Sequence, residues 1–271
     1  MDFTSTNKVS IFDAYKNPIG SENGSINTSE YFLRIAEGKI PGSKIVHKFG
    51  KNTDVGTSFE TIWNGGGAYS GFNATEAESV TIVSDSELDT AGGTGLRTLR
   101  LYGLDENLLE QTEDIELDGL TPVTSTLSYL RLDISRGLTA GTTGQNQGDI
   151  TIAQSITTAN IFAVLPAGYN ATTIGAYTIP AGKNGYILTQ AVSLANKQSA
   201  FISARIKIRM PGSVFTTSGE ATLNAVGTSF IERKFTVPIK IPPGTDLFIE
   251  AEADSPVAVS CFLDILLVDV E

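Results

Sequence analysis

The sequence predicts an all-β protein with two antiparallel β-sandwich or jelly-roll domains that follow an extended N-terminal arm. Three observations predict this fold. The apolar segments are short and β-branched, and they alternate with polar residues at a period of two. Turn-forming Gly, Asn, Asp and Pro separate them at intervals of roughly 10–15 residues. No rhythm of strands alternating with helices is present, which argues against a doubly wound parallel sheet.

We expect the arm to occupy residues 1–40. Residues 17–29 are polar and rich in turn formers, which favours a segment that packs on a neighbour over one that contributes to a core. Residues 29–37 (SEYFLRIAE) fit two helical turns ended by Gly38, and they fit an edge strand equally well.

The second predicted part, residues 41–155, is an acidic β-sandwich domain. Residues 80–83 read as a strand, and residues 98–102 alternate before a turn at 103–107. Residues 112–117 then return as the partner strand of a hairpin, and residues 129–134 alternate again.

The third predicted part, residues 156–271, is the C-terminal sandwich domain. Pro180 and Gly182 mark a turn after a short strand, and Pro242, Pro243 and Gly244 mark another. The strands expected in this part are residues 176–179, 185–194, 201–209, 230–241, 246–253 and 257–270.

Composition excludes several classes of function. The 271 residues include 30 acidic and 19 basic side chains, a net charge of −11, and an acidic chain of pI about 4.6 does not suit general nucleic-acid binding. Residues 1–155 hold 21 acidic and 11 basic residues, so they carry −10 of this charge. No apolar run reaches the roughly 18 residues of a membrane span. The first ten residues also lack the basic and apolar regions of a signal peptide.

The single His47 and the single Cys261 leave little room for catalysis or metal binding. One cysteine excludes an intramolecular disulfide and a cysteine-based metal site, and one histidine excludes a histidine-pair relay. We interpret His47 as a structural or surface residue and Cys261 as a buried apolar filler. The prediction is therefore a protein that is not an enzyme and that has no cofactor and no metal.

Two other features have a functional and a structural interpretation. Residues 105–118 contain seven acidic and no basic residues, which indicates a solvated hairpin face; a docking face for a basic partner or a cation site are the alternatives. No DxDxDG calcium pattern is present. The glycine clusters at 65–67 and 92–95 do not match GxxxxGK[ST], so we interpret them as loops or close backbone contacts rather than phosphate sites.

Six residues are candidates for contact with a partner protein. They are His47, Lys48, Phe49, Trp63, Tyr69 and Phe72. Trp63 with Tyr69 and Phe72 would form either a sugar-stacking platform or, as is more common for aromatic side chains, anchors of a core or an interface.

Residues 47–63 (HKFGKNTDVGTSFETIW) resemble a family of structural proteins of tailed bacteriophages that is common in marine and cyanobacterial phages. The resemblance extends over roughly residues 40–270. Further similar segments are residues 89–95, 97–99, 103–105, 129–131, 177–183 and 235–238. It implies a virion protein that is assembled in the host cytoplasm and has no catalytic residues to transfer.

Our hypothesis from the sequence is a capsid decoration or cement protein. It would bind the major capsid protein or other virion proteins as a homo-oligomer, expected to be a trimer, with the arm and residues 38–67 as contacts to the shell. A component of the tail, baseplate or fibre is one alternative, and a glycan-binding module that uses Trp63 is another. A secreted adhesin fits less well because the signal sequence is missing.

Overall fold

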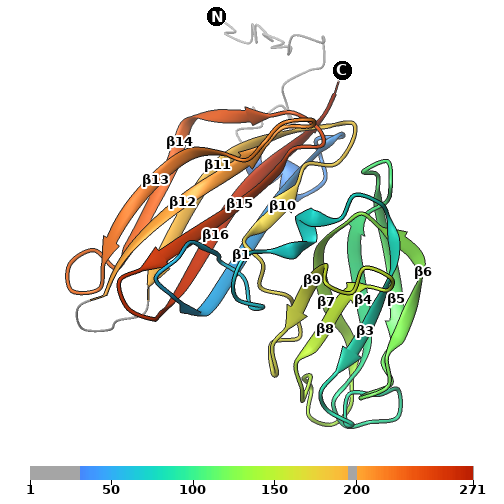
Figure 1. The fold of residues 1–271 in the computed structure, drawn as a ribbon. Helices are drawn as coiled ribbons and strands as arrows, with labels where there is room; N and C mark the ends of the chain where they lie inside the picture. The colour runs from blue at the N-terminus through green and yellow to red at the C-terminus, as the bar shows by residue number, and fades with distance from the viewer. Residues whose placement is uncertain (1–30, 195–199, 271) are drawn as a thin grey trace, which may run out of the picture. The chain divides into compact units, whose positions relative to one another are not determined.

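The computed structural model describes residues 31–194 and 200–270, and it is built almost entirely of antiparallel strands (Figure 1). The predicted all-β class with β-sandwich domains is confirmed. Residues 1–44 form one unit and residues 45–271 another. Of the predicted arm, residues 1–30 lie outside the described residues. The helical alternative for residues 29–37 is the correct one, because α1 spans Tyr31–Ala36 and Gly38 follows with φ of +69°.

The larger unit contains two β-sandwiches. The first, which we call the C-terminal sandwich, pairs a sheet in the order β1-β16-β11-β14 with a sheet in the order β10-β15-β12-β13, and β2 joins the edge of β15. Its strands are β1 (Ser43–Val55), β2 (Glu60–Thr61), β10 (Ala176–Thr178), β11 (Lys183–Leu194), β12 (Phe201–Arg209), β13 (Thr216–Asn224), β14 (Phe230–Ile241), β15 (Asp246–Ala253) and β16 (Val257–Asp269).

The second, which we call the inserted sandwich, is formed by the chain between β2 and β10. One sheet has the order β6-β3-β8-β9 and the other has the order β5-β4-β7. A short 3-10 helix, η1 (Ser70–Asn73), leads into it. Its strands are β3 (Glu78–Ser84), β4 (Leu96–Leu104), β5 (Glu110–Glu116), β6 (Val123–Tyr129), β7 (Arg131–Ala140), β8 (Ile150–Gln154) and β9 (Ile161–Leu165).

The inserted sandwich interrupts what would otherwise be one strand. Both β2 and β10 pair with the same edge of β15, Thr61 opposite Glu250 and Ala176 opposite Phe248. Between these pairs, the backbone N–H of Ile62 donates to Ile249, and that of Gly175 donates to Ile62. The chain therefore leaves the C-terminal sandwich at Ile62 and returns to it at Gly175.

Glycine is required at this crossing. A Cβ atom on Gly50, the glycine of the HKFG segment, would lie 2.3 Å from the carbonyl oxygen of Ile62 and 2.4 Å from the backbone nitrogen of Gly175. Neither backbone atom is the end of a flexible side chain, so only a residue without Cβ fits. The HKFG segment thus lets β1 approach the point of insertion.

The two sandwiches do not divide the chain where the sequence suggested. The expected boundary after residue 155 falls between β8 and β9, which are hydrogen-bonded neighbours in one sheet. The strands β1 and β2, expected in the acidic domain of residues 41–155, belong to the C-terminal sandwich. The reason is the insertion, because a linear division assumes that strands close in sequence share a sheet.

Each sandwich has its own apolar core. In β4, Leu99 and Leu101 are fully buried on the inner face, as the period of two predicts. In the C-terminal sandwich, Val259, Cys261 and Leu263 repeat the same pattern along β16. Within the described ranges, no helix has the length and hydropathy to cross a membrane.

Candidate functional site: the junction between the two sandwiches

Three of the six candidate contact residues are core residues. Trp63, Tyr69 and Phe72 have exposed fractions of 3%, 8% and 6% and belong to the core of the inserted sandwich. Their rings pack edge to face, with centroids 5.1 Å apart for Trp63 and Tyr69 and 5.0 Å apart for Tyr69 and Phe72. A sugar-stacking platform or a partner anchor needs an exposed ring face, so these residues do not supply one in this structure.

The glycine cluster beside these rings makes a close backbone contact. A Cβ atom on Gly65 would lie 2.3 Å from the Trp63 ring, and the indole nitrogen of Trp63 donates to the carbonyl of Gly67 at 3.1 Å. The backbone N–H of Gly67 also donates to Glu60. The loop therefore wraps around an indole and a carboxylate.

Glu60, within the ETIW segment, holds the start of the insertion together. Its carboxylate accepts hydrogen bonds from the backbone N–H groups of Gly67 at 2.9 Å and Gly56 at 3.1 Å, and from the Asn52 side chain at 3.0 Å. Burial acts to raise the pKa of Glu60, but these donors outweigh it, and the pKa lies below its ordinary value. The motif residues thus connect β1, β2 and the glycine loop.

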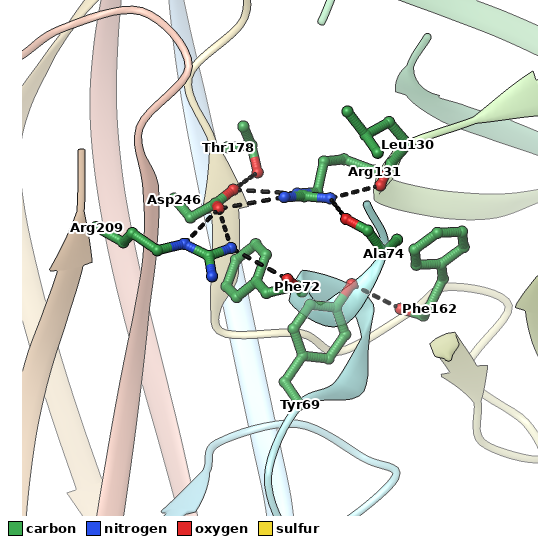
Figure 2. A network of polar contacts seen from close by, with 9 residues as sticks. All are labelled: Tyr69, Phe72, Ala74, Leu130, Arg131, Phe162, Thr178, Arg209 and Asp246. Atoms are coloured by element: carbon green, nitrogen blue, oxygen red, sulfur yellow. Dashed lines mark hydrogen bonds and ion pairs between the residues drawn. The ribbon is translucent and has the colours of Figure 1, made fainter. Parts of the chain in front are cut away.

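An ionic network joins the two sandwiches (Figure 2). Asp246, at the start of β15, is buried, and its carboxylate accepts from Arg131 Nε at 3.1 Å and from Arg209 Nη2 at 2.5 Å. Thr178 Oγ1 donates to the same carboxylate at 2.6 Å. Arg131 begins β7 of the inserted sandwich, whereas Arg209 ends β12 of the C-terminal sandwich. One carboxylate therefore links both bodies.

The two arginines also satisfy backbone carbonyls around η1. Arg131 Nη1 donates to the carbonyls of Ala74 at 3.0 Å and Leu130 at 2.8 Å, and Arg209 Nη2 donates to Phe72 at 3.1 Å. Both guanidinium groups lie within 6 Å of the Phe72 ring. Removing one partner from such a buried network is costly because the remaining charges stay buried.

Tyr69 completes the junction as a neutral donor. Its hydroxyl donates to the carbonyl of Phe162 at 3.0 Å (Figure 2). Burial raises the pKa of the phenol well above its ordinary value. Tyr69 is therefore a structural hydrogen-bond donor that does not exchange its proton at physiological pH.

The other three candidate residues, all on β1, line a groove against the inserted sandwich. We call it the β1–β7 groove, and its cavity volume is about 320 Å³. The residues that line it are His47, Lys48, Phe49, Ile134, Arg136, Tyr169, Ala171, Thr172 and Thr173. The structure therefore brings His47, Lys48 and Phe49 together with residues of the inserted sandwich that the sequence analysis did not single out.

Lys48 is a buried cation in this groove. Its ammonium group donates to the backbone carbonyl of Asp133 and lies 5.7 Å from the centroid of the Tyr177 ring. Desolvation lowers the pKa of Lys48 from 10.5 to about 8, against the opposing field of Asp133. Lys48 thus keeps most of its charge at neutral pH but loses it in mildly alkaline solution.

His47 lies at the exposed end of the groove. Its Nδ1 atom is 2.7 Å from Asp264 Oδ1 on the neighbouring strand β16, so an orienting carboxylate is present. Within residues 31–194 and 200–270, the structure gives no hydroxyl or thiol bonded to the second ring nitrogen. Phe49 stacks on Phe262 at 5.1 Å. This arrangement orients a surface histidine but supplies no nucleophile.

The remaining sequence interpretations concern Cys261 and the acidic run. Cys261 is buried, as expected for an apolar filler, and burial raises the pKa of its thiol to about 12. The acidic run forms the β4–β5 hairpin, as expected. In it, Arg100 donates two hydrogen bonds to Asp114 at 2.6 and 2.7 Å. Across residues 31–194 and 200–270, no group of three or more His, Cys, Asp and Glu side chains is placed to hold a metal.

Sequence reasoning missed the Asp246 network and Arg136. Asp246 carried a weak signal, because a carboxylate at the start of a strongly apolar strand needs a partner. Nothing in the sequence indicates that Arg131 and Arg209 are those partners, since the contact forms only after the insertion folds back on β15.

Comparisons with known proteins give no family. No family model matches the chain, and no curated protein matches it. Among solved structures, the infectious bursal disease virus VP2 subviral particle is 9% identical, with 89% of this chain and 83% of that chain covered and a TM-score of 0.19. Vicilin from Corylus avellana (hazelnut) is 8% identical, with 85% and 76% covered and a TM-score of 0.13. Likenesses at these scores carry no functional argument.

Proposed function

We propose that this chain is a structural protein of a tailed-phage virion that acts as a head decoration or cement protein and assembles as a homo-oligomer. The observation that carries the proposal is the strand order of the C-terminal sandwich. When β2 and β10 are counted as one interrupted strand, one sheet holds strands one, eight, three and six in chain order, and the other holds two, seven, four and five. We infer from this order a jelly roll, an architecture of viral capsid domains and also of lectins.

The positions of the resembling segments support the proposal. The HKFG and ETIW segments frame the insertion point, and residues 177–183 form β10 and the turn before β11. In the YLR segment, Arg131 supplies one side of the Asp246 network. The residues that resemble the phage family are thus those that build and join the two sandwiches.

Two free sheet edges on the C-terminal sandwich support assembly. The strands β13 and β14 each end a sheet, and exposed apolar side chains accompany them. Val237 on β14 is 81% exposed, Val226 in the following turn region of β13 is 75% exposed, and Val214 before β13 is 73% exposed. Free edges with apolar side chains favour association with another chain.

The edge of β14 is irregular. It therefore favours contact through side chains over a continuous ladder of backbone hydrogen bonds to another strand. Ile187 on β11 pairs with Ile239, whereas Thr189 pairs with Lys234, so the intervening residues of β14 leave the register. These are residues 235–238 (FTVP), and Pro238 has no N–H to donate. We therefore assign Val237 as an apolar knob that contacts a second copy of the chain.

The proposed mechanism is stabilisation by linkage. A protein that binds the assembled shell and not its free subunits shifts the equilibrium toward the shell. Its partner on the head would be the major capsid protein. Stabilisation of this kind requires only a surface that is complementary to the assembled shell.

The test is to count the copies on purified particles and to measure the heat tolerance of particles that lack the protein. Hundreds of copies and a lower temperature of genome release would support the head role. Tens of copies at one vertex would overturn that role in favour of a tail, baseplate or fibre component. Absence from purified particles would overturn the virion proposal altogether.

A further inference from the structure

We propose that the β1–β7 groove binds a small anionic ligand, one that carries a carboxylate or a phosphate group beside an apolar face. The cavity of about 320 Å³ lies in the range of roughly 300–1,000 Å³ that is typical of small-molecule sites. Its lining is divided between apolar side chains, such as Phe49 and Ile134, and cationic or hydroxyl side chains. This inference does not depend on the proposed virion role.

The groove is a local concentration of positive charge on an acidic body. The inserted sandwich, residues 62–175, holds 14 acidic and four basic residues. Of those four, Arg100 pairs with Asp114, Arg131 pairs with Asp246, and Arg97 donates to a backbone carbonyl. Arg136 is exposed, lines the groove, and has no ion pair or side-chain hydrogen bond to any residue that the structure describes.

Two further cations accompany Arg136. Lys48 is buried in the lining; its ammonium group, which has three N–H donors, donates to the carbonyl of Asp133, and the negative charge of Asp133 also acts on it. Lys51 donates to the Tyr169 hydroxyl at 2.7 Å and lies 5.4 Å from the centroid of that ring. The nearby carboxylate of Asp264 is already engaged by His47 at 2.7 Å. An anion would therefore meet the exposed Arg136 guanidinium beside the ammonium group of Lys48.

An unpaired hydroxyl belongs to one of the residues that line the groove. Thr173 is 2% exposed, and its Oγ1 atom is buried without a hydrogen-bond partner. Its neighbour Thr172 is engaged, because its Oγ1 accepts from the backbone N–H of Ser135 at 3.1 Å. Buried polar atoms are nearly always paired, and this oxygen has almost no accessible surface, so a ligand in the groove would reach it only after the Thr173 side chain rotates.

The test uses the full chain and backbone amide NMR at constant ionic strength, with inorganic phosphate, glucuronate and uncharged glucose as probes. We expect saturable shifts of the Phe49 and Thr173 amides with the two anions and none with glucose. Tighter binding of phosphate would indicate a phosphorylated ligand, and tighter binding of glucuronate would indicate a carboxylated one. No saturable shift with either anion would overturn the proposal.

Two variants and one matched control make the test specific. Arg136→Gln removes a charge-assisted hydrogen bond and is expected to weaken anion binding at least about tenfold. Thr173→Val removes only the hydroxyl and is expected to weaken it less. Arg233→Gln removes the same charge on β14, where Arg233 stacks on Phe235, and is expected to leave binding unchanged. Equal losses in Arg136→Gln and Arg233→Gln would show general charge attraction and would overturn the site.

Discussion

Each sandwich has an open side, which lies between the two strands that end its sheets. The two sandwiches differ in the side chains that they place at this open side. In the inserted sandwich, β5 and β6 end their sheets, and the Glu113 carboxylate on β5 accepts from Thr126 and Leu127 on β6. In the C-terminal sandwich, β13 and β14 end their sheets. Phe230 and Val237 are exposed on β14, and the exposed Val214 and Val226 lie just before and after β13. The comparison teaches that the inserted sandwich joins its end strands by side-chain hydrogen bonds, whereas the C-terminal sandwich exposes apolar side chains beside its end strands, as the proposed association requires.

Charge follows the same division. The inserted sandwich, residues 62–175, carries −10 of the total charge of −11, so the rest of the chain is almost neutral. A strongly charged surface repels copies of itself and favours solubility, whereas a neutral surface with apolar side chains permits association. The insertion thus separates a solvated body from one suited to contact, and the junction holds both together.

The largest expected effect comes from breaking the junction between these two bodies. Asp246→Asn removes the carboxylate that the buried Arg131 and the half-buried Arg209 share in the network, so it leaves uncompensated charge. We expect the free energy of unfolding to fall by about 3–5 kcal/mol, measured by urea denaturation. The control is Asp114→Asn, which breaks an exposed pair with Arg100 and should change stability far less. Similar small changes in both variants would contradict a coupling role for Asp246.

The next effect concerns Lys48, which lies on the groove side of the same junction. Its pKa of about 8 is below its ordinary value of 10.5, so between these pH values the unfolded chain binds more protons than the folded chain. The Lys48 contribution to the free energy of unfolding therefore rises between pH 8 and pH 10.5, by about 2–3 kcal/mol. Below pH 8, burying the charge opposes folding.

Comparison with Lys48→Met isolates this contribution. Burial raises the pKa values of Cys261 and Tyr69, so these groups lower stability at alkaline pH and would mask the effect in the wild type alone. We expect Lys48→Met to be as stable as the wild type or more stable at pH 7, and its advantage to shrink as the pH rises to 10.5. Parallel stability curves for the two proteins over this window would refute the assignment.

A smaller effect is expected at the closed side of the inserted sandwich. Glu113→Ala removes the hydrogen bonds that Glu113 makes from β5 to β6, including one of 2.7 Å to the Thr126 hydroxyl, and leaves the one from Gln111 to the carbonyl of Ser128. Because the site is partly solvated, we expect a loss of about 1 kcal/mol in urea denaturation. The matched change Glu116→Ala, on the same strand without a hydrogen bond described for its side chain, should leave stability unchanged. If Glu116→Ala cost as much, strand propensity rather than closure would explain the result.

The elements were predictable from the sequence because alternation is a local signal. Residues 98–102, the turn at 103–107 and the return at 112–117 coincide with the β4–β5 hairpin, and the Pro180–Lys183 turn joins β10 to β11. The grouping of strands into sandwiches was not predictable. Thr61 and Ala176 pair with the same edge of β15, opposite Glu250 and Phe248. The periodicity of the sequence does not indicate that the chain comes back to this edge after the insertion.

The candidate site was predictable only in part, for a related reason. Trp63, Tyr69 and Phe72 carry the same aromatic signal whether they anchor a partner or fill a core, and only packing decides between these roles. Lys48 lies among polar and apolar residues on β1, and its ammonium group contacts the carbonyl of Asp133 in the insertion, a contact that the local sequence does not indicate. The β1–β7 groove has walls from both sandwiches, and its composition therefore appears only in three dimensions.

The smallest effect on stability, and the sharpest test of the open side, is expected for Val237→Glu. Val237 is 81% exposed, so the free energy of unfolding should stay within about 0.5 kcal/mol of the wild type. A charge at the proposed contact should nevertheless convert the proposed homo-oligomer to monomers, measured by light scattering after gel filtration. The matched control is Ile156→Glu, the same kind of change at a residue that is 83% exposed in the inserted sandwich. If the open edges of the C-terminal sandwich direct assembly, only Val237→Glu dissociates the protein. Dissociation by both variants would mean that added negative charge alone is responsible, and dissociation by neither would place the contact elsewhere.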